Sequence, residues 1–105
     1  MSRLTFSNAL TRLKGAPEDY VELLEHGSMS VELYKPVGTD PQQPHDQDEL
    51  YVVASGSGYF VNGADRHAFE TGEVLFVRAG VEHRFEDFSD DFATWVIFYG
   101  PQGGE

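Results

Sequence analysis

The segment ELYVVASGSGYFVNGADRHAF, residues 49–69, decides the fold class because two runs of β-forming residues are separated by glycine turns. The first run is bounded by Gly56 and Gly58. The second run contains Asn62 and Gly63, a dipeptide typical of two-residue β-hairpin turns. The segment therefore predicts short antiparallel strands, each followed by its own turn.

The same alternation of short strands and turns continues in both directions from this segment. Gly27 and Ser28 separate two β-forming runs, a spacing that predicts another hairpin. The further runs cover residues 19–26, 29–36, 73–79, 83–88 and 92–100, and a polar tail follows at 101–105. Parallel strands would need long crossover connections, usually helices, and none is evident between these runs. We therefore predict an all-β fold, an antiparallel sandwich or barrel with the jelly roll as the leading candidate.

Residues 1–15 predict a short helical arm before the first strand. Ser7 is expected to cap a helix that carries Leu10 and Leu13, and Gly15 is expected to end it. The whole chain of 105 residues is expected to form one domain, because a chain of this length buries only enough surface for a single core.

The composition excludes several classes of function. The chain has 18 acidic and 7 basic residues, so its formal charge of -11 repels nucleic acid and anionic membranes. It has no cysteine, which excludes disulfides, zinc-thiolate sites and cysteine nucleophiles. No apolar run is long enough for a signal peptide or a membrane span, and we therefore expect a cytoplasmic location.

Three side chains of the kinds that bind metals gather where the strand at residues 49–55 begins, namely Gln43, His45 and Glu49. An uninterrupted strand would place Glu49 about 13 Å from His45. The intervening residues 46–48 are poor strand formers, so a bend there could bring the two together. By itself the cluster favours a solvated acidic loop over a metal site.

A second segment, GEVLFVRAGVEH at residues 72–83, changes that balance. It runs along a predicted strand, turns at Gly80 and places His83 three residues beyond the turn. A histidine from a different strand completes a set of two imidazoles and one carboxylate.

Together the two segments resemble the paired motifs of the cupin family. His45, Glu49 and Gly56 match the first motif, G-x5-H-x-H-x3-E-x6-G, with Gln43 where the first histidine usually stands. In the second motif, G-x5-P-x-G-x2-H-x3-N, the matching residues are Gly72, Gly80 and His83, with Arg78 at the usual proline and Asp87 at the usual asparagine.

The resemblance implies a jelly-roll β-barrel that holds one divalent metal ion, with His45, Glu49 and His83 as ligands and Gln43 as a candidate fourth ligand. Imidazole and carboxylate ligands suit iron, manganese, nickel or zinc. The implied function is a metal-dependent enzyme acting on a small polar molecule, either a dioxygenase of the quercetinase or acireductone type or an isomerase. The alternative is a non-catalytic module that binds or senses a small ligand or a metal. Small cupins often pair through their sheets, so a homodimer is also implied.

Aromatic residues alternate along the last strand and are compatible with an inward face. The candidates for lining a substrate pocket are Tyr51, Phe85, Trp95, Tyr99 and Gln47. His26 and His67 lie at a hairpin and on a polar strand, and we expect both on the surface.

Overall fold

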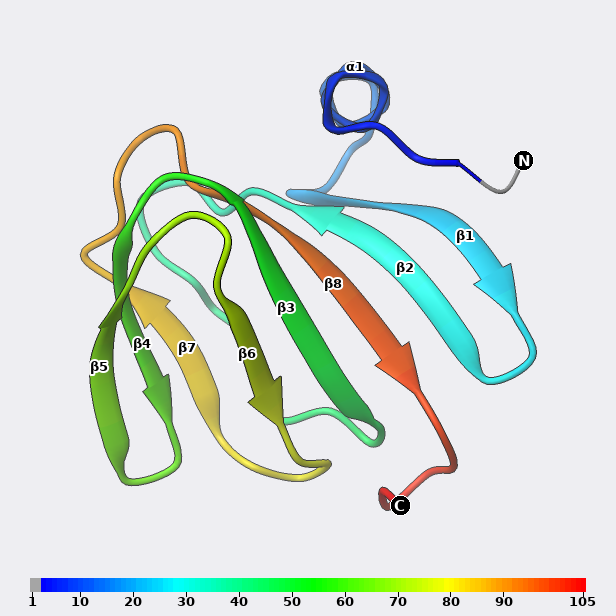
Figure 1. Ribbon diagram of the computed structural model, residues 1–105, viewed down its shortest axis with the longest axis vertical. Helices are drawn as coiled ribbons and strands as arrows, with labels where there is room; N and C mark the ends of the chain where they lie inside the picture. Colours follow the sequence, from blue (N-terminus) through cyan, green and yellow to red (C-terminus); the bar gives the residue numbers. More distant parts are fainter. Residues whose placement is uncertain (1–2) are drawn as a thin grey trace.

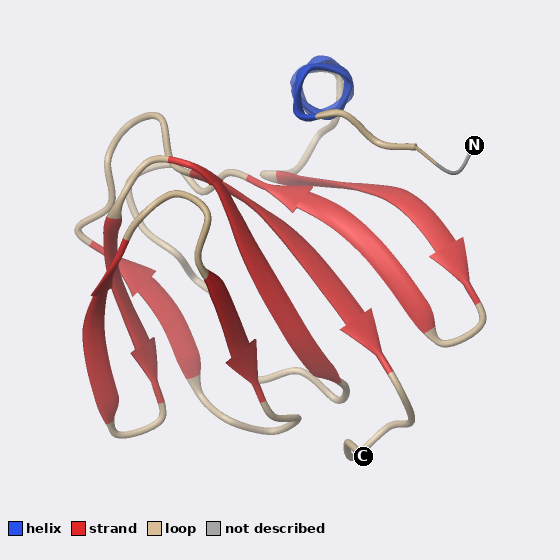
Figure 2. Cartoon of the chain, viewed as in Figure 1, coloured by secondary structure: helices blue, strands red, loops and turns tan. Residues whose placement is uncertain are grey.

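The computed structural model describes residues 3–105 and consists of two antiparallel β-sheets with one helix packed at the side (Figures 1 and 2). The elements in chain order are α1 (Phe6–Lys14), β1 (Tyr20–His26), β2 (Met29–Tyr34), β3 (Asp48–Ser55), β4 (Gly58–Asn62), β5 (Asp65–Phe69), β6 (Val74–Val77), β7 (His83–Glu86) and β8 (Ala93–Tyr99). One sheet has the order β1-β2-β8-β3-β6 and the other has the order β5-β4-β7. The predicted antiparallel all-β fold with a short N-terminal helix is confirmed.

The turns form where glycine was expected to allow them. Gly27 adopts φ 58° between β1 and β2, and Gly63 adopts φ 60° between β4 and β5. An L side chain rarely adopts these angles, whereas glycine does so without a steric penalty. The two hairpins fix the register of β1 against β2 and of β4 against β5.

Helix α1 begins two residues earlier than the sequence predicted. Thr5, and not Ser7, is the N-cap, because its backbone is extended and its hydroxyl accepts from the amide of Asn8 at 3.2 Å. The helix packs Ala9 against Leu33 of β2, and both are buried. Helix α1, the one helix in residues 3–105, is neither long nor apolar enough to cross a membrane.

The core lies between the two sheets and is dominated by aromatic rings. Tyr51 of β3 packs edge-to-face on Phe85 of β7, with ring centroids 4.9 Å apart, and Phe60 of β4 lies 4.8 Å from Phe85. All three rings are at most 2% exposed. Because side chains alternate along a strand, Glu49 shares the inward face of β3 with Tyr51 and is drawn into the same interior.

Strand β8 presents the opposite face from the one predicted. Val96 and Phe98 pair with the inward-facing Tyr51 and Glu49 of β3, so they point into the barrel. Trp95 and Tyr99 therefore point to the outer side, and Trp95 packs with the helix-side cluster. The sequence alternation could not decide between the faces, because apolar residues occupy both sides of this strand.

The close approach between Gly56 and the segment before β8 supplies a test of the fold. Gly56 adopts φ 86°, and a Cβ atom there would lie 2.6 Å from Cα of Phe92. We expect Gly56→Ala to lower the free energy of unfolding by about 3 kcal/mol, from the combined clash and backbone strain. Gly27→Ala has positive φ but open space, and should cost about 1 kcal/mol. Equal losses in urea denaturation would contradict the clash.

Candidate metal site

Two histidines and one glutamate from three separate segments meet at one end of the barrel interior. His45 lies in the loop before β3, Glu49 is the second residue of β3, and His83 opens β7 of the facing sheet. Each offers one ligand atom, and these atoms all lie within 4.8 Å of one another. The site therefore joins the two sheets.

The bend predicted between His45 and Glu49 is present. The chain turns at Asp46 and Gln47, so that Nε2 of His45 lies 3.8 Å from Oε1 of Glu49. Asp48 holds the end of the bend, since its carboxylate accepts from the amides of Ala79 at 2.8 Å and Glu105 at 2.9 Å. These bonds lower the pKa of Asp48 and leave it a structural residue.

Glu49 and His83 face each other without a complete set of hydrogen bonds. Nε2 of His83 is 2.8 Å from Oε1 of Glu49, yet that nitrogen and both carboxylate oxygens have no hydrogen-bond partner of good geometry. The two residues are 0% and 2% exposed. A buried polar group without a partner is costly, so an unsatisfied cluster of this kind needs an explanation.

The tautomer of His83 is set by its other nitrogen. Nδ1 lies 2.8 Å from the carbonyl oxygen of Val81, which only accepts, so in the neutral ring Nδ1 carries the proton. The lone pair on Nε2 then points at the Glu49 carboxylate. Two groups that both accept cannot satisfy each other, and a cation between them would satisfy both.

The two imidazoles differ in their proton affinity. Burial lowers the pKa of His45, and this effect outweighs the opposing attraction of the Glu49 carboxylate; the nearby His83 lowers the pKa further. Burial alone would also lower the pKa of His83, but the Glu49 carboxylate and the Val81 carbonyl raise it. The site thus attracts one positive charge, either a proton on His83 or a metal ion, and its two imidazoles and one carboxylate suit a divalent transition metal.

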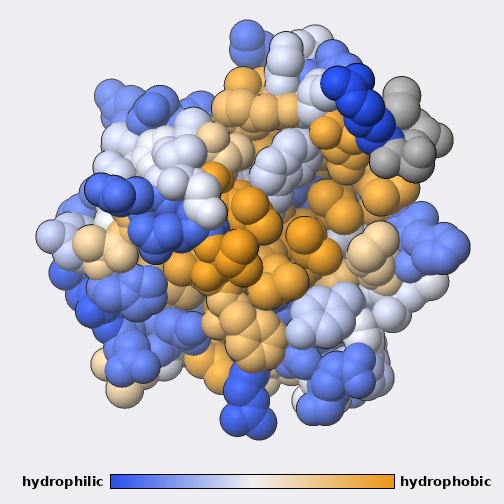
Figure 3. Space-filling model, viewed as in Figure 1, coloured by the Kyte–Doolittle hydropathy of each residue, from blue (hydrophilic) through white to orange (hydrophobic). Residues whose placement is uncertain are grey.

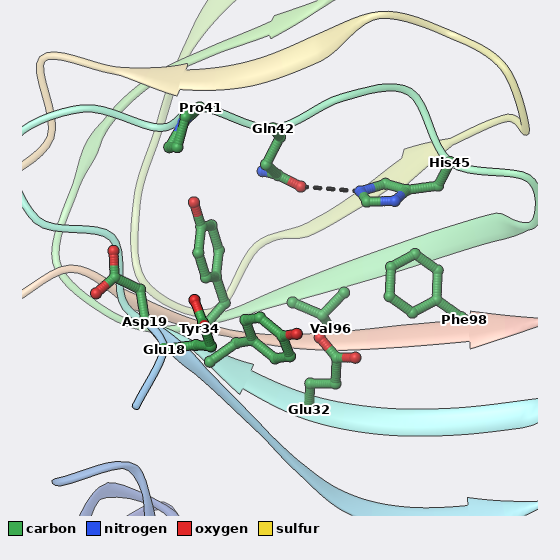
Figure 4. Close-up of a pocket in the computed structure, with 10 residues that line it drawn as sticks. Glu18, Asp19, Glu32, Tyr34, Pro41, Gln42, His45, Val96 and Phe98 are labelled. Atoms are coloured by element: carbon green, nitrogen blue, oxygen red, sulfur yellow. Dashed lines mark hydrogen bonds between the residues drawn. The ribbon is translucent and has the colours of Figure 1, made fainter. Parts of the chain in front are cut away.

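Gln42, and not Gln43, contacts the site. Gln43 is exposed, whereas the amide oxygen of Gln42 lies 3.1 Å from Nε2 of His45 (Figure 4). That oxygen also accepts from the hydroxyl of Tyr51 at 2.9 Å, and the Gln42 amide nitrogen donates to Asp40 at 2.7 Å. The family pattern placed Gln43 at a ligand position, but in this loop the side chain of the preceding residue lies beside His45 instead.

The other residues predicted to line the pocket lie in different parts of the structure. Tyr51 and Phe85 lie in the buried core, and the ring of Tyr51 is 6.0 Å from that of His83. Gln47 lies at a neighbouring hollow, where its amide donates to the backbone of Ser28 and Gly100. Trp95 and Tyr99 belong to the outer face described above. His26 and His67 are exposed, as expected.

A cavity of about 400 Å³ opens beside His45 and was not predicted from the sequence. Its walls are drawn in Figure 4 and come from the segment before β1, from β1, β2 and β8, and from the loop before β3. The lining residues are Glu18, Asp19, Tyr20, Glu32, Tyr34, Pro41, Gln42, His45, Val96 and Phe98. The ring of Phe98 packs against His45, with centroids 4.9 Å apart. The cavity therefore borders the three-residue cluster at His45.

Glu32 is a partly buried acidic residue of this cavity that the sequence did not predict. It lies on β2, opposite Glu22 of β1. Burial, with repulsion from Glu22 and Glu49, raises its pKa to about 7. An acidic residue in a strand between the apolar Val31 and Leu33 was the available signal, but without the fold it is typical of an outward-facing position.

Comparisons with known proteins identify the family of this chain. A family model described as a cupin domain matches residues 30–99. An uncharacterized protein from Streptomyces coelicolor is 40% identical over 85 residues, covering 79% of this chain and 81% of that protein. The transcriptional activator RhaS of Yersinia pestis is 33% identical over 73 residues, covering 70% of this chain, but the match spans only 27% of that protein.

Solved structures show the same architecture. A putative mannose-6-phosphate isomerase from Ralstonia eutropha superposes with a TM-score of 0.62 at 25% identity, covering 83% of this chain and 89% of that one. A protein of unknown function from Rhizobium leguminosarum gives a TM-score of 0.70 at 16% identity, covering 96% and 98% of the two chains. The second likeness concerns the fold alone.

The raised pKa of Glu32 predicts a stability that depends on pH. The folded protein binds this proton more tightly than the unfolded chain does, so Glu32 destabilises the fold increasingly as the pH rises from about 4.5 through about 7. We expect Glu32→Gln to stabilise the metal-free protein by about 1 kcal/mol at pH 8, after allowance for solvent screening, and to have little effect at pH 4.5.

Thermal or urea unfolding in the presence of a chelator measures this effect. The exposed Glu70, which does not line the cavity, supplies the control Glu70→Gln. If Glu32→Gln gave no greater stabilisation at pH 8 than at pH 4.5, the assigned environment of Glu32 would be wrong.

Proposed function

Because this chain belongs to the cupin domain family, we propose that it binds one divalent metal ion through His45, Glu49 and His83. The observation that carries the proposal is the buried pair of Glu49 and His83, whose facing atoms have no hydrogen-bond partner. Iron, manganese, nickel and zinc all accept two imidazoles and one carboxylate. Gln42 is the candidate for a fourth contact, since its amide oxygen already lies beside His45.

We propose further that the protein is a metal-dependent enzyme acting on a small polar molecule. A bound metal would act as a Lewis acid toward an oxygen atom of the substrate. The residues of the chain then orient the reacting partners: Asp40 and Tyr51 hold Gln42, and Phe98 packs on His45 at the cavity wall. Isomerase chemistry is favoured by the similarity to the putative mannose-6-phosphate isomerase, and dioxygenase chemistry is the second candidate.

A non-catalytic sensing role is the alternative from another class of function. It is supported by the similarity to RhaS, a transcriptional activator, over 70% of this chain. The cavity beside His45 would then bind an effector without turnover. Once His45, Glu49 and His83 bind a metal, none of these three side chains is free to act as a general acid or base.

Elemental analysis of protein purified without chelator or affinity tag tests the metal directly, and one ion per chain is the expected result. Reconstitution with each metal, followed by oxygen-uptake assays on flavonols and enediols and isomerisation assays on sugars, separates the functions. Oxygen consumption would favour the dioxygenase, sugar interconversion the isomerase, and ligand binding without either the sensing module. A protein with no stoichiometric metal would contradict the proposed site.

The same proposal includes a homodimer formed through the outer face of the five-stranded sheet. Val74 and Phe76 of β6 are 61% and 46% exposed, and they pair with Val52 and Leu50 of β3. Figure 3 shows apolar side chains gathered at the centre of this view, where Figure 1 draws β3, β6 and β8. On a chain with a net charge of -11, an apolar face of this kind favours a partner surface that is also apolar, as a second copy would offer.

The ligand set predicts a graded loss of metal binding. We expect His83→Ala or Glu49→Ala to abolish stoichiometric binding of zinc or iron, because each removes a ligand and leaves a buried partner unpaired. Gln42→Ala should weaken binding about tenfold. Gln43→Ala, one residue away and exposed, is the matched control and should leave binding unchanged.

Isothermal titration at constant pH measures these affinities. A tighter metal complex in Gln42→Ala would show that the amide competes with the metal for His45. Equal losses in Gln42→Ala and Gln43→Ala would show that the loop has a different conformation in solution.

The dimer predicts a change of mass when the outer face is charged. Phe76→Asp should weaken self-association about 100-fold, so that a dimer at micromolar concentration becomes a monomer. Val37→Asp places the same charge on an exposed loop residue and should leave the dimer intact. Sedimentation or light scattering gives the mass, and a monomeric wild-type protein would overturn the proposal.

A further inference from the structure

The cavity beside His45 has an unusual balance of charge. Three of its ten lining residues are acidic, namely Glu18, Asp19 and Glu32, and none is lysine or arginine. The nearest lysine in sequence, Lys35, is held elsewhere, since its ammonium group donates to the backbone carbonyls of Asp90 and Phe92. The cavity therefore presents negative charge that no side chain of its wall neutralises.

The three carboxylates are also free of partners within the described residues 3–105. No ion pair or side-chain hydrogen bond of that part of the chain involves Glu18, Asp19 or Glu32. Glu18 and Asp19 are exposed at the cavity mouth, whereas Glu32 is partly buried beside Val96 and Phe98 (Figure 4). Burial, and then repulsion from Glu22 and Glu49, raise the pKa of Glu32 and penalise its charged form, and a nearby cation would relieve part of that penalty.

The remaining wall is aromatic and apolar. Tyr20, Tyr34 and Phe98 contribute rings to the cavity, and Val96 contributes its floor in Figure 4. Aromatic faces next to carboxylates favour organic cations, because the ring quadrupole and the negative charges act in the same direction. The volume of about 400 Å³ is within the range of small-molecule pockets.

A second feature connects the cavity with the candidate metal site. His45 is part of its wall and also belongs to the three-residue cluster in which Glu49 and His83 are buried with unsatisfied atoms. A molecule in the cavity would therefore have one end at the cluster and the other among the carboxylates.

We propose that this cavity binds a small organic cation, such as an amine, with its charged group between Glu32 and the Glu18–Asp19 pair. The proposal rests on the function proposed above for the location of the site and specifies the class of its ligand. The three carboxylates would repel the phosphate of a phosphorylated sugar or the carboxylate of a keto acid. Such negatively charged groups are therefore not expected in this part of the cavity.

The test compares three probes that share one phenyl ring. Benzylamine is positively charged, benzyl alcohol is neutral and benzoate is negatively charged. Their binding to the full-length protein is measured by NMR titration at low ionic strength, first with a chelator and then with zinc. We expect benzylamine to bind about tenfold more tightly than benzyl alcohol, and benzoate to bind more weakly than either. The preference should decrease as salt is added.

Variants assign the effect to the cavity. Glu32→Gln should reduce benzylamine binding about tenfold and leave benzyl alcohol unchanged. The double variant Glu18→Gln with Asp19→Asn removes the two negative charges at the cavity mouth. Both residues are exposed, so the variant should fold normally. Glu70→Gln lies outside the cavity and should leave all three affinities unchanged.

The outcomes separate this inference from the metal site. Equal affinity for the three probes, or an unchanged preference in both cavity variants, would overturn the inference even if zinc binds. A preference for benzylamine in a protein that does not bind zinc would retain the inference and reject the metal site. If the wild-type protein binds a second zinc ion and Glu32→Gln does not, the cavity carboxylates hold a metal. That result would also overturn the inference that the cavity binds an organic cation.

Discussion

The burial of one carboxylate against one imidazole is the constraint on which the site depends. Glu49 and His83 come from different sheets, and each is held by a framework that fixes its direction: β3 by pairing on both edges, and His83 by the carbonyl of Val81. Neither side chain can turn to solvent without moving a core strand. The aromatic core around Tyr51 thus keeps the two groups together despite the unfavourable desolvation of both.

The loop between β2 and β3 completes the site through side-chain hydrogen bonds. Asp40 is buried and accepts from the hydroxyl of Tyr34, the amide of Gln42 and the backbone of Phe85. It therefore fixes the loop to both sheets and sets the position of Gln42 beside His45. A loop held in this way can place ligands precisely enough for a metal while leaving the cavity beside it open.

The five-stranded sheet has two faces with different roles. The inward face carries Glu49, Val96 and Phe98, which contribute to the interior, the cluster and the cavity. Helix α1 covers part of the outer face over β1 and β2, and the part over β3 and β6 stays exposed. Because both faces are largely apolar, the alternation of β8 could not show in advance which residues would reach the cavity.

The sequence by itself determined the strands, their turns and three members of the site. Glycine positions and β-forming runs are local signals, and the spacing of His45, Glu49 and His83 matches a family pattern, so none of these required the tertiary structure. Only the fold decided that Gln42 contacts His45, that Trp95 faces outward and that Glu32 joins the cavity. Loop dihedral angles follow no period, and residues distant in sequence meet only when the two sheets pack together.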